Sequence, residues 1–165
     1  MFVWFAAVSI TVVALVFGSR DLDYRLVMFG SVLPLAEGVF GGRWVLHSVV
    51  FNAVLLLGVM VVARGRRPTQ RRWLALPIGT FCHLVLDGTW ADTGVFWWPF
   101  TGLDALGRDA VSEFERLPVV LLLEAIGLMV GWWAWRRFSL YDRSVRQTLL
   151  TEGRLSALGR RQCST

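Results

Sequence analysis

The sequence has 165 residues, of which 55% are hydrophobic and 13% aromatic, and its mean hydropathy is +0.55. This apolar content exceeds what a soluble domain of this size needs for its core, so a lipid bilayer is the expected solvent. The formal net charge of +5 comes from seventeen arginines and no lysine. Because the arginines cluster beside apolar stretches, they indicate membrane orientation and argue against a nucleic-acid-binding surface.

About five apolar segments follow one another along the chain. The first runs from Met1 to Gly18. The second, from about Tyr24 to Phe40, is predicted to be short and broken, because Pro34 lacks a backbone donor. The others run from Trp44 to Ala63, from Trp73 to about Gly88, and from Pro118 to Trp135. We therefore expect an all-α, polytopic membrane protein with about five transmembrane or re-entrant helices.

The arginine clusters predict how these helices are oriented. One cluster lies in the loop at residues 64–72, between the third and fourth segments, and another follows the fifth. Such clusters stay in the cytoplasm, so the N-terminus of a five-helix domain would lie outside. We expect a membrane domain over residues 1–138 and a cytoplasmic Arg-rich tail over residues 139–165. The connection from Thr89 to Leu117 would then lie outside.

Tryptophans are expected to mark both membrane interfaces, where their amphipathic rings are stable. The outer interface would contain Trp90, Trp97 and Trp98, and the inner interface Trp132, Trp133 and Trp135. Membrane lipids are therefore the first expected partners.

Ionisable side chains inside predicted spans are costly and by default indicate function. Four of them are His47, His83, Asp87 and Glu124, and they include both histidines of the chain. His83 and Asp87 are four residues apart, so one helix face brings them within reach of a shared ion or of each other. At ~1.5 Å of rise per residue, the predicted orientation puts all four near the outer leaflet, together with Glu37.

Two imidazoles and a carboxylate suit a divalent ion, zinc above all, with an open position for water. We predict that His47, His83 and Asp87 hold the ion and that Glu37 and Glu124 are the catalytic carboxylates that support it. Such a site would activate water for hydrolysis. Two other interpretations stay open: the histidines and the aspartate hydrogen-bond helices together without metal, or Glu124 only orients a histidine.

The depth of the predicted site indicates the class of substrate. Near the lipid head groups, an ester or phosphoester carried by a lipid is the natural candidate. Arg43, four residues before His47, would bind its phosphate. The alternative from another class is a non-enzymatic membrane scaffold or adaptor, in which the same polar groups join helices.

Several motifs carry a resemblance to a known family. They are Asp21 to Arg25, Gly30 to Pro34, Arg43 to Phe51, His83-Leu-Val-Leu-Asp87-Gly and Trp97-Trp-Pro-Phe100. With these motifs the chain resembles the bacterial membrane-bound metal-dependent hydrolases, also named LexA-binding inner-membrane-associated hydrolases, and among them the shorter actinobacterial members. The last two motifs are the most specific.

The resemblance implies a metal-dependent hydrolase of the bacterial inner membrane. His47, His83 and Asp87 match the family's histidine and aspartate positions. The chain departs from the pattern after Pro34, where it has Leu35 and family members usually carry an aspartate. That first acidic ligand is therefore missing or displaced to Glu37.

Overall fold

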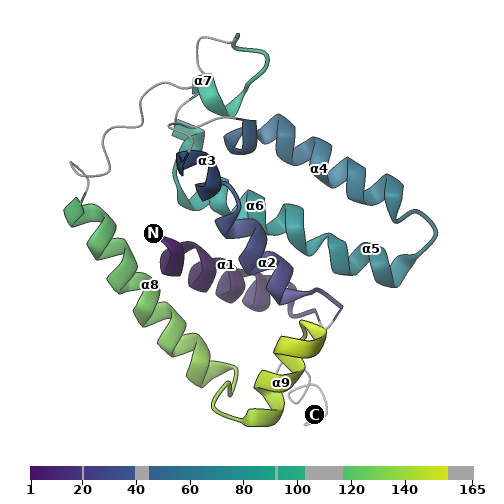
Figure 1. The fold of residues 1–165 in the computed structure, drawn as a ribbon, viewed down its shortest axis with the longest axis vertical. Helices are drawn as coiled ribbons and strands as arrows, with labels where there is room; N and C mark the ends of the chain where they lie inside the picture. Colours follow the sequence, from purple (N-terminus) through teal and green to yellow (C-terminus); the bar gives the residue numbers. More distant parts are fainter. Residues whose placement is uncertain (20, 40–44, 92, 103–116, 156–165) are drawn as a thin grey trace.

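The computed structural model describes residues 1–19, 21–39, 45–91, 93–102 and 117–155, and these residues form helices and connections without strands (Figure 1). The helices that correspond to the predicted segments are α1 (Phe2–Phe17), α2 (Tyr24–Val32) with α3 (Leu35–Val39), α4 (Val49–Val62), α6 (Ala75–Leu86) and α8 (Leu117–Arg137). The shorter helices are η1 (Val45–His47), α5 (Arg67–Trp73), η2 (Thr89–Ala91), α7 (Thr93–Phe96) and α9 (Arg143–Glu152). The all-helical prediction is confirmed for this part of the chain.

The boundaries differ from the prediction in two places. The third segment begins with the 3-10 turn η1, and α4 starts only after Ser48. The Ser48 hydroxyl oxygen caps α4 by accepting a hydrogen bond from the backbone N–H of Val50 at 3.1 Å. The Arg-rich loop contains a further helix, α5, with a proline in its first turn, where that residue is well tolerated. The break of the second segment at Pro34 agrees with the sequence.

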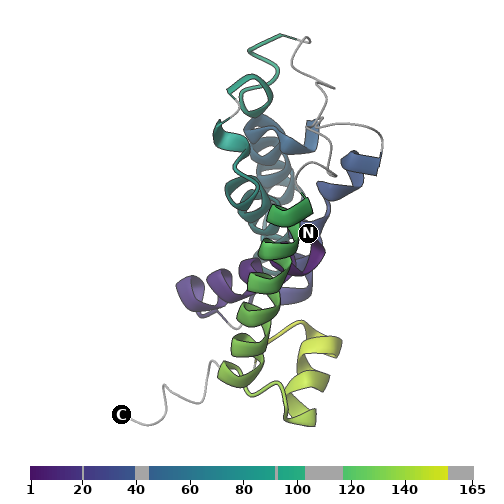
Figure 2. The same cartoon turned by 90° about the vertical axis from the view of Figure 1, so that its left-hand side faces the viewer.

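Among the described helices, α8 alone is long and apolar enough to cross a membrane, with 21 residues. It extends along much of the molecule (Figure 2). The helices α1 and α4 are apolar but shorter, so the number of crossings stays a prediction. All three helices expose large apolar side chains, including Val16 at 71%, Val62 at 88% and Met129 at 65%. Apolar surface of this extent needs a cover, and lipid would provide it.

Helices α2 and α6 cross closely because each carries a glycine at the crossing. A Cβ on Gly30 would collide with the backbone carbonyl oxygen of Leu76, and a Cβ on Gly79 would collide with a carbonyl oxygen of α2. Both collisions are with backbone, which cannot rotate away as a side chain can. The close approach places Ser31 of α2 against His83 of α6.

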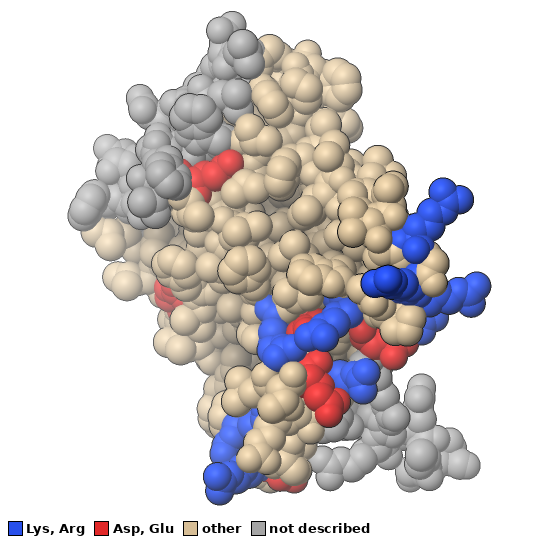
Figure 3. All heavy atoms as spheres, turned by 45° about the vertical axis from the view of Figure 1, so that its right-hand side comes forward, with Lys and Arg blue, Asp and Glu red and all other residues tan. Residues whose placement is uncertain are grey.

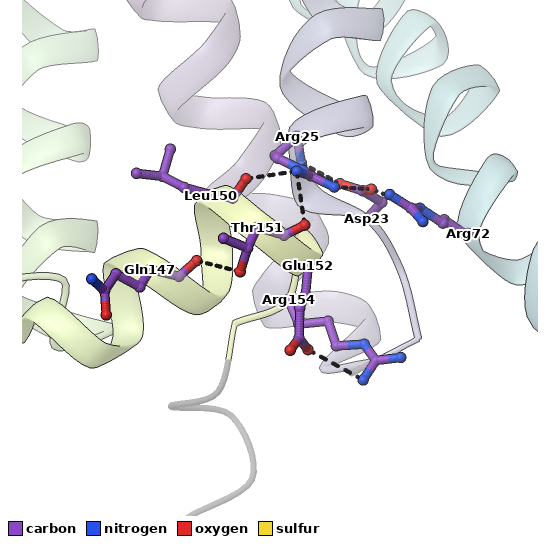
Figure 4. A network of polar contacts seen from close by, with 8 residues as sticks. All are labelled: Asp23, Arg25, Arg72, Gln147, Leu150, Thr151, Glu152 and Arg154. Atoms are coloured by element: carbon purple, nitrogen blue, oxygen red, sulfur yellow. Dashed lines mark hydrogen bonds and ion pairs between the residues drawn. The ribbon is translucent and has the colours of Figure 1, made fainter.

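A buried aspartate joins three helices at one end of the molecule (Figure 4). The Asp23 carboxylate, 2% exposed, accepts hydrogen bonds from the guanidinium groups of Arg25 and Arg72, each at 2.9 Å. It also caps α2 by accepting from the Arg25 backbone N–H at 3.1 Å. The Arg25 guanidinium donates in addition to the carbonyl oxygens of Leu150 and Thr151, at 2.7 and 3.2 Å. Asp23 and Arg25 therefore connect α2, α5 and α9.

The chain after α9 returns to the start of α2. Gly153 ends α9 with φ +74°, a conformation that favours glycine. Its carbonyl oxygen accepts a hydrogen bond from the Tyr24 N–H at 2.8 Å. A Cβ at Gly153 would collide with the Asp23 carboxylate, and Leu155 is buried in the core formed by α1, α2, α6 and α8. The end of the described chain thus packs against the start of α2.

Charged side chains gather at this end, while most of the face in Figure 3 is uncharged. Arg71 and Arg72 of α5 pair with Asp21 and Asp23, and α9 contacts the same connection through Arg25. The Arg-rich loop and the segment after α8 therefore lie on the same end of the molecule. This arrangement is compatible with the predicted cytoplasmic side, which itself stays a prediction.

The α2–α6 crossing should not tolerate a methyl group. We expect Gly30→Ala to lower the free energy of unfolding in detergent by about 1–3 kcal/mol, since the added carbon displaces backbone. The control is Gly58→Ala in α4, where a Cβ would have no neighbour within 4 Å. The free energy of unfolding of this control should equal or slightly exceed that of the wild type, because alanine has a higher helix propensity than glycine. Equal midpoints for both variants in thermal unfolding would contradict the close crossing.

The contacts of Asp23 with Arg25 and Arg72 should make the stability of the protein fall at acidic pH. Burial raises the pKa of Asp23, but hydrogen bonds from Arg25 and Arg72, together with the Arg25 charge, outweigh it and hold the pKa below its ordinary value. A carboxylate whose pKa is lower in the folded state adds stability above its unfolded pKa. That stability is lost as the pH falls through the folded pKa, hence below about pH 4.

We expect Asp23→Asn to cost about 3 kcal/mol at pH 7, because two guanidinium groups lose their shared anion. The difference from wild type should shrink as the pH falls below about 4. The control is Asp21→Asn, which removes an exposed ion pair to Arg71 and should have little effect. Thermal unfolding over a pH series measures the stability of both variants. If the difference between Asp23→Asn and the wild type did not change with pH, the Asp23 carboxylate would not be the source of the pH dependence.

Candidate metal centre

Three predicted ligands come together where η1 meets the end of α6. One ligand atom from each of His47, His83 and Asp87 lies within 4.8 Å of those of the other two. His83 belongs to the last turn of α6, Asp87 ends that helix, and His47 ends η1. Both histidines are buried, at 5% and 0% exposure, and Asp87 is partly exposed. The cluster therefore combines an enclosed pair of imidazoles with a carboxylate that solvent can reach.

Glu37 holds the ring of His47. Its Oε2 lies 2.9 Å from Nδ1 of His47, and its Oε1 accepts the backbone N–H of Leu46 at 2.8 Å. An ionised carboxylate only accepts hydrogen bonds, so Nδ1 carries the proton and Nε2 has the lone pair that a metal needs. A carboxylate that orients a ligating histidine in this way is common in metal sites. In this geometry Glu37 positions His47, and its predicted catalytic role stays a prediction.

A backbone carbonyl holds the ring of His83. The Ser31 oxygen lies 2.7 Å from Nδ1 of His83. A carbonyl can only accept, so His83 also carries its proton on Nδ1 and offers Nε2 as a ligand. The ring packs against Phe5, at 4.1 Å between centroids, and lies edge-on to His47 at 5.3 Å and 76°. Both imidazoles are therefore held in the same tautomer.

Asp87 is oriented by the turn that follows α6. Its Oδ2 accepts a hydrogen bond from the hydroxyl of Thr89 at 2.8 Å, and Thr89 is fully buried. Between them Gly88 takes φ +70°, which reverses the chain. Each of the three candidate ligands thus has a second polar partner that limits its rotation.

The residues fit a divalent ion in composition and nearly in spacing. Two imidazoles and one carboxylate with a fourth position open is a ligand set of catalytic zinc sites. Donor atoms around such an ion are roughly 3.4 Å apart, given bonds of about 2.1 Å. The separations here extend to 4.8 Å, so binding would draw the three groups inward.

Glu124 does not join this cluster as predicted, because α1 engages it. Its carboxylate lies 2.9 Å from the amine of Met1 and accepts the backbone N–H groups of Val3 and Trp4 at 3.1 and 3.2 Å. The first turn of a helix leaves such N–H groups without intrahelical partners and attracts a carboxylate. Glu124 therefore stabilises the α1–α8 contact. Arg43, predicted to bind phosphate, lies outside the described residues.

Sequence reasoning missed three contacts of the centre. The Ser31 carbonyl has no signal in the sequence, because every residue carries one. The Phe5 ring is one of many aromatics in apolar helices. Thr89 could have been found, since Asp87-Gly88-Thr89 is a turn sequence whose side chains commonly hydrogen-bond each other.

One comparison with known proteins identifies a relationship. The family model described as YdjM inner membrane protein matches residues 3–150, which include all three candidate ligands and Glu37. No curated protein and no solved structure matches the chain.

The contact between Glu37 and His47 should matter for metal affinity. We expect Glu37→Gln to weaken zinc binding by about tenfold or more, because the neutral amide loses the charge-assisted hydrogen bond to Nδ1. Competition with a chromophoric chelator measures the affinity. The control is Glu152→Gln, at an exposed position, and its zinc affinity should match that of the wild type. An unchanged affinity in Glu37→Gln would mean that His47 is not a ligand positioned by Glu37.

Proposed function

Since the chain belongs to the YdjM inner membrane protein family, we propose that it is a metal-dependent hydrolase of the bacterial inner membrane. The observation that carries this proposal is the meeting of His47, His83 and Asp87, whose ligand atoms lie within 4.8 Å of one another. Membership of the family supports the membrane location and does not by itself supply the reaction. The reaction rests on the donor set.

Both imidazoles are in the tautomer that can bind a metal through Nε2. Nδ1–H of His47 donates a hydrogen bond to Glu37, and Nδ1–H of His83 donates one to the Ser31 carbonyl, so both Nε2 atoms carry lone pairs. This preparation costs nothing when the metal arrives, because no tautomer has to change. Burial keeps competing water away from both rings.

The charge of the donor set favours an anionic substrate. Two neutral imidazoles and one carboxylate would leave a divalent ion with a net charge of about +1. Such an ion lowers the pKa of a coordinated water and so supplies a nucleophile at neutral pH. Asp87, partly exposed, is on the side of the cluster that a substrate can approach. We therefore favour an ester or phosphoester, carried by a lipid, with Arg43 as a candidate phosphate partner.

A scaffold without metal is the alternative, and one observation favours it. The hydrogen bond from His83 to the Ser31 carbonyl joins α6 to α2, and the His83 ring packs on Phe5 of α1. These contacts would hold three helices together with no ion present. The two functions differ in whether purified protein takes up metal.

The first test is metal content. We expect detergent-purified wild type, dialysed against trace zinc, to contain close to one ion per chain by elemental analysis. The double variant His83→Ala/Asp87→Ala should lose it. Glu124→Gln should keep it, because Glu124 contacts α1 instead of the cluster. No metal in the wild type would end the hydrolase proposal in favour of the scaffold.

The second test is turnover. The zinc-loaded wild type and the double variant are compared on a chromogenic carboxylic ester and a chromogenic phosphodiester in mixed micelles. We expect at least a hundredfold loss in the variant on one of these substrates, since removing two ligands removes the ion that activates water. Bound metal without turnover on either substrate would assign the ion a structural role instead.

A further inference from the structure

A groove runs along α8 on the side that faces the start of α1. Its volume is about 680 Å³, and its lining includes Val3, Leu128, Gly131 and Trp132. This volume falls within the range of small-molecule pockets, roughly 300–1,000 Å³. The lining is apolar over this part, and Gly131 contributes no side chain to fill it. The groove is separate from the histidine cluster, because none of the candidate ligands lines it.

One end of the groove is cationic and aromatic. Arg136 and Tyr141 line it there, and the Arg136 guanidinium stacks on the ring of Trp132 at 4.3 Å. A second guanidinium, of Arg146, lies 5.7 Å from the ring of Trp135, which also lines the groove. A guanidinium stacked on an indole keeps its N–H donors in its plane, where a phosphate can accept them.

From this combination we propose that the groove binds one anionic phospholipid of the membrane. The acyl chain lies along Leu128 and Gly131, and the phosphate accepts hydrogen bonds from Arg136, with Arg146 adding positive charge nearby. Eight residues separate Leu128 from Arg136, which is ~12 Å along a helix. Half of a hydrocarbon core is about 15 Å thick. The lining residues of α8 therefore cover most of an acyl chain's path from the interface toward the middle of the bilayer.

The polar end lies where a head group should be. α8 ends at Arg137, directly after the tryptophans, and this order of apolar, aromatic and cationic residues is typical of a membrane interface. The connection between α8 and α9 contains Tyr141, which is 68% exposed and also lines the groove, so its hydroxyl is available to a head group. Two guanidinium groups beside one groove favour a lipid with net negative charge over a zwitterionic one.

The experiment is native mass spectrometry of the full chain in detergent, with phosphatidylglycerol and phosphatidylcholine of the same acyl chains added in equal amounts. We expect the wild type to retain phosphatidylglycerol preferentially. Arg136→Gln should reduce this adduct about fivefold, the loss expected from one arginine near an anionic lipid. Arg137→Gln is the matched control, because Arg137 is adjacent and does not line the groove.

A second variant tests the apolar part. Leu128→Ala should remove apolar contact from the groove and lower the adducts of both lipids, while thermal unfolding reports whether the variant stays folded. Equal retention of the two lipids by the wild type would overturn the proposal. Equal loss of phosphatidylglycerol in Arg136→Gln and Arg137→Gln would do the same, because it would indicate attraction by general surface charge.

Discussion

The close crossing of α2 and α6 determines where the parts of the candidate centre can lie. Because two glycines let the backbones meet there, the Ser31 carbonyl reaches the ring of His83 and fixes its tautomer. α4 is then positioned on the other side of α6, where the Asn52 amide contacts the Thr80 hydroxyl at 3.0 Å. That contact is buried and so limits sliding of α4, and with it the turn that carries His47. A wider crossing would move the Ser31 carbonyl away from the His83 ring.

The candidate metal centre and the charged residues around Asp23 lie at different ends of the molecule. The histidine cluster lies near η1, η2 and α7, while α5 and α9 meet the Asp23 junction toward the opposite end (Figure 1). Between these ends the helices present apolar surface, as an inner membrane protein requires. Among the described residues, several buried polar side chains gather at the candidate centre, where Ser31, Ser48 and Thr89 lie near the two histidines.

The sequence predicted the helices well because long apolar runs leave few alternatives. The spacing of His83 and Asp87 correctly joined these two residues, and the expected depth correctly placed His47 with them. It predicted less about side-chain direction. A depth along the membrane normal does not say which face of a helix a residue occupies, so Glu124 seemed to belong with the histidines although it faces α1. Backbone partners such as the Ser31 carbonyl depend on how helices cross, and residue types alone do not encode that.

The return of the chain to the start of α2 affects the order in which this protein can be completed. The acceptors that Leu150 and Thr151 provide for Arg25 lie 125 and 126 residues later in the sequence, and Gly153, the partner of Tyr24, follows them. Ribosomes add residues from the N-terminus, so α1, α2 and α6 exist well before these groups do. The contacts between α9 and the start of α2 consequently form late in translation, after α1, α2 and α6 have already been synthesised.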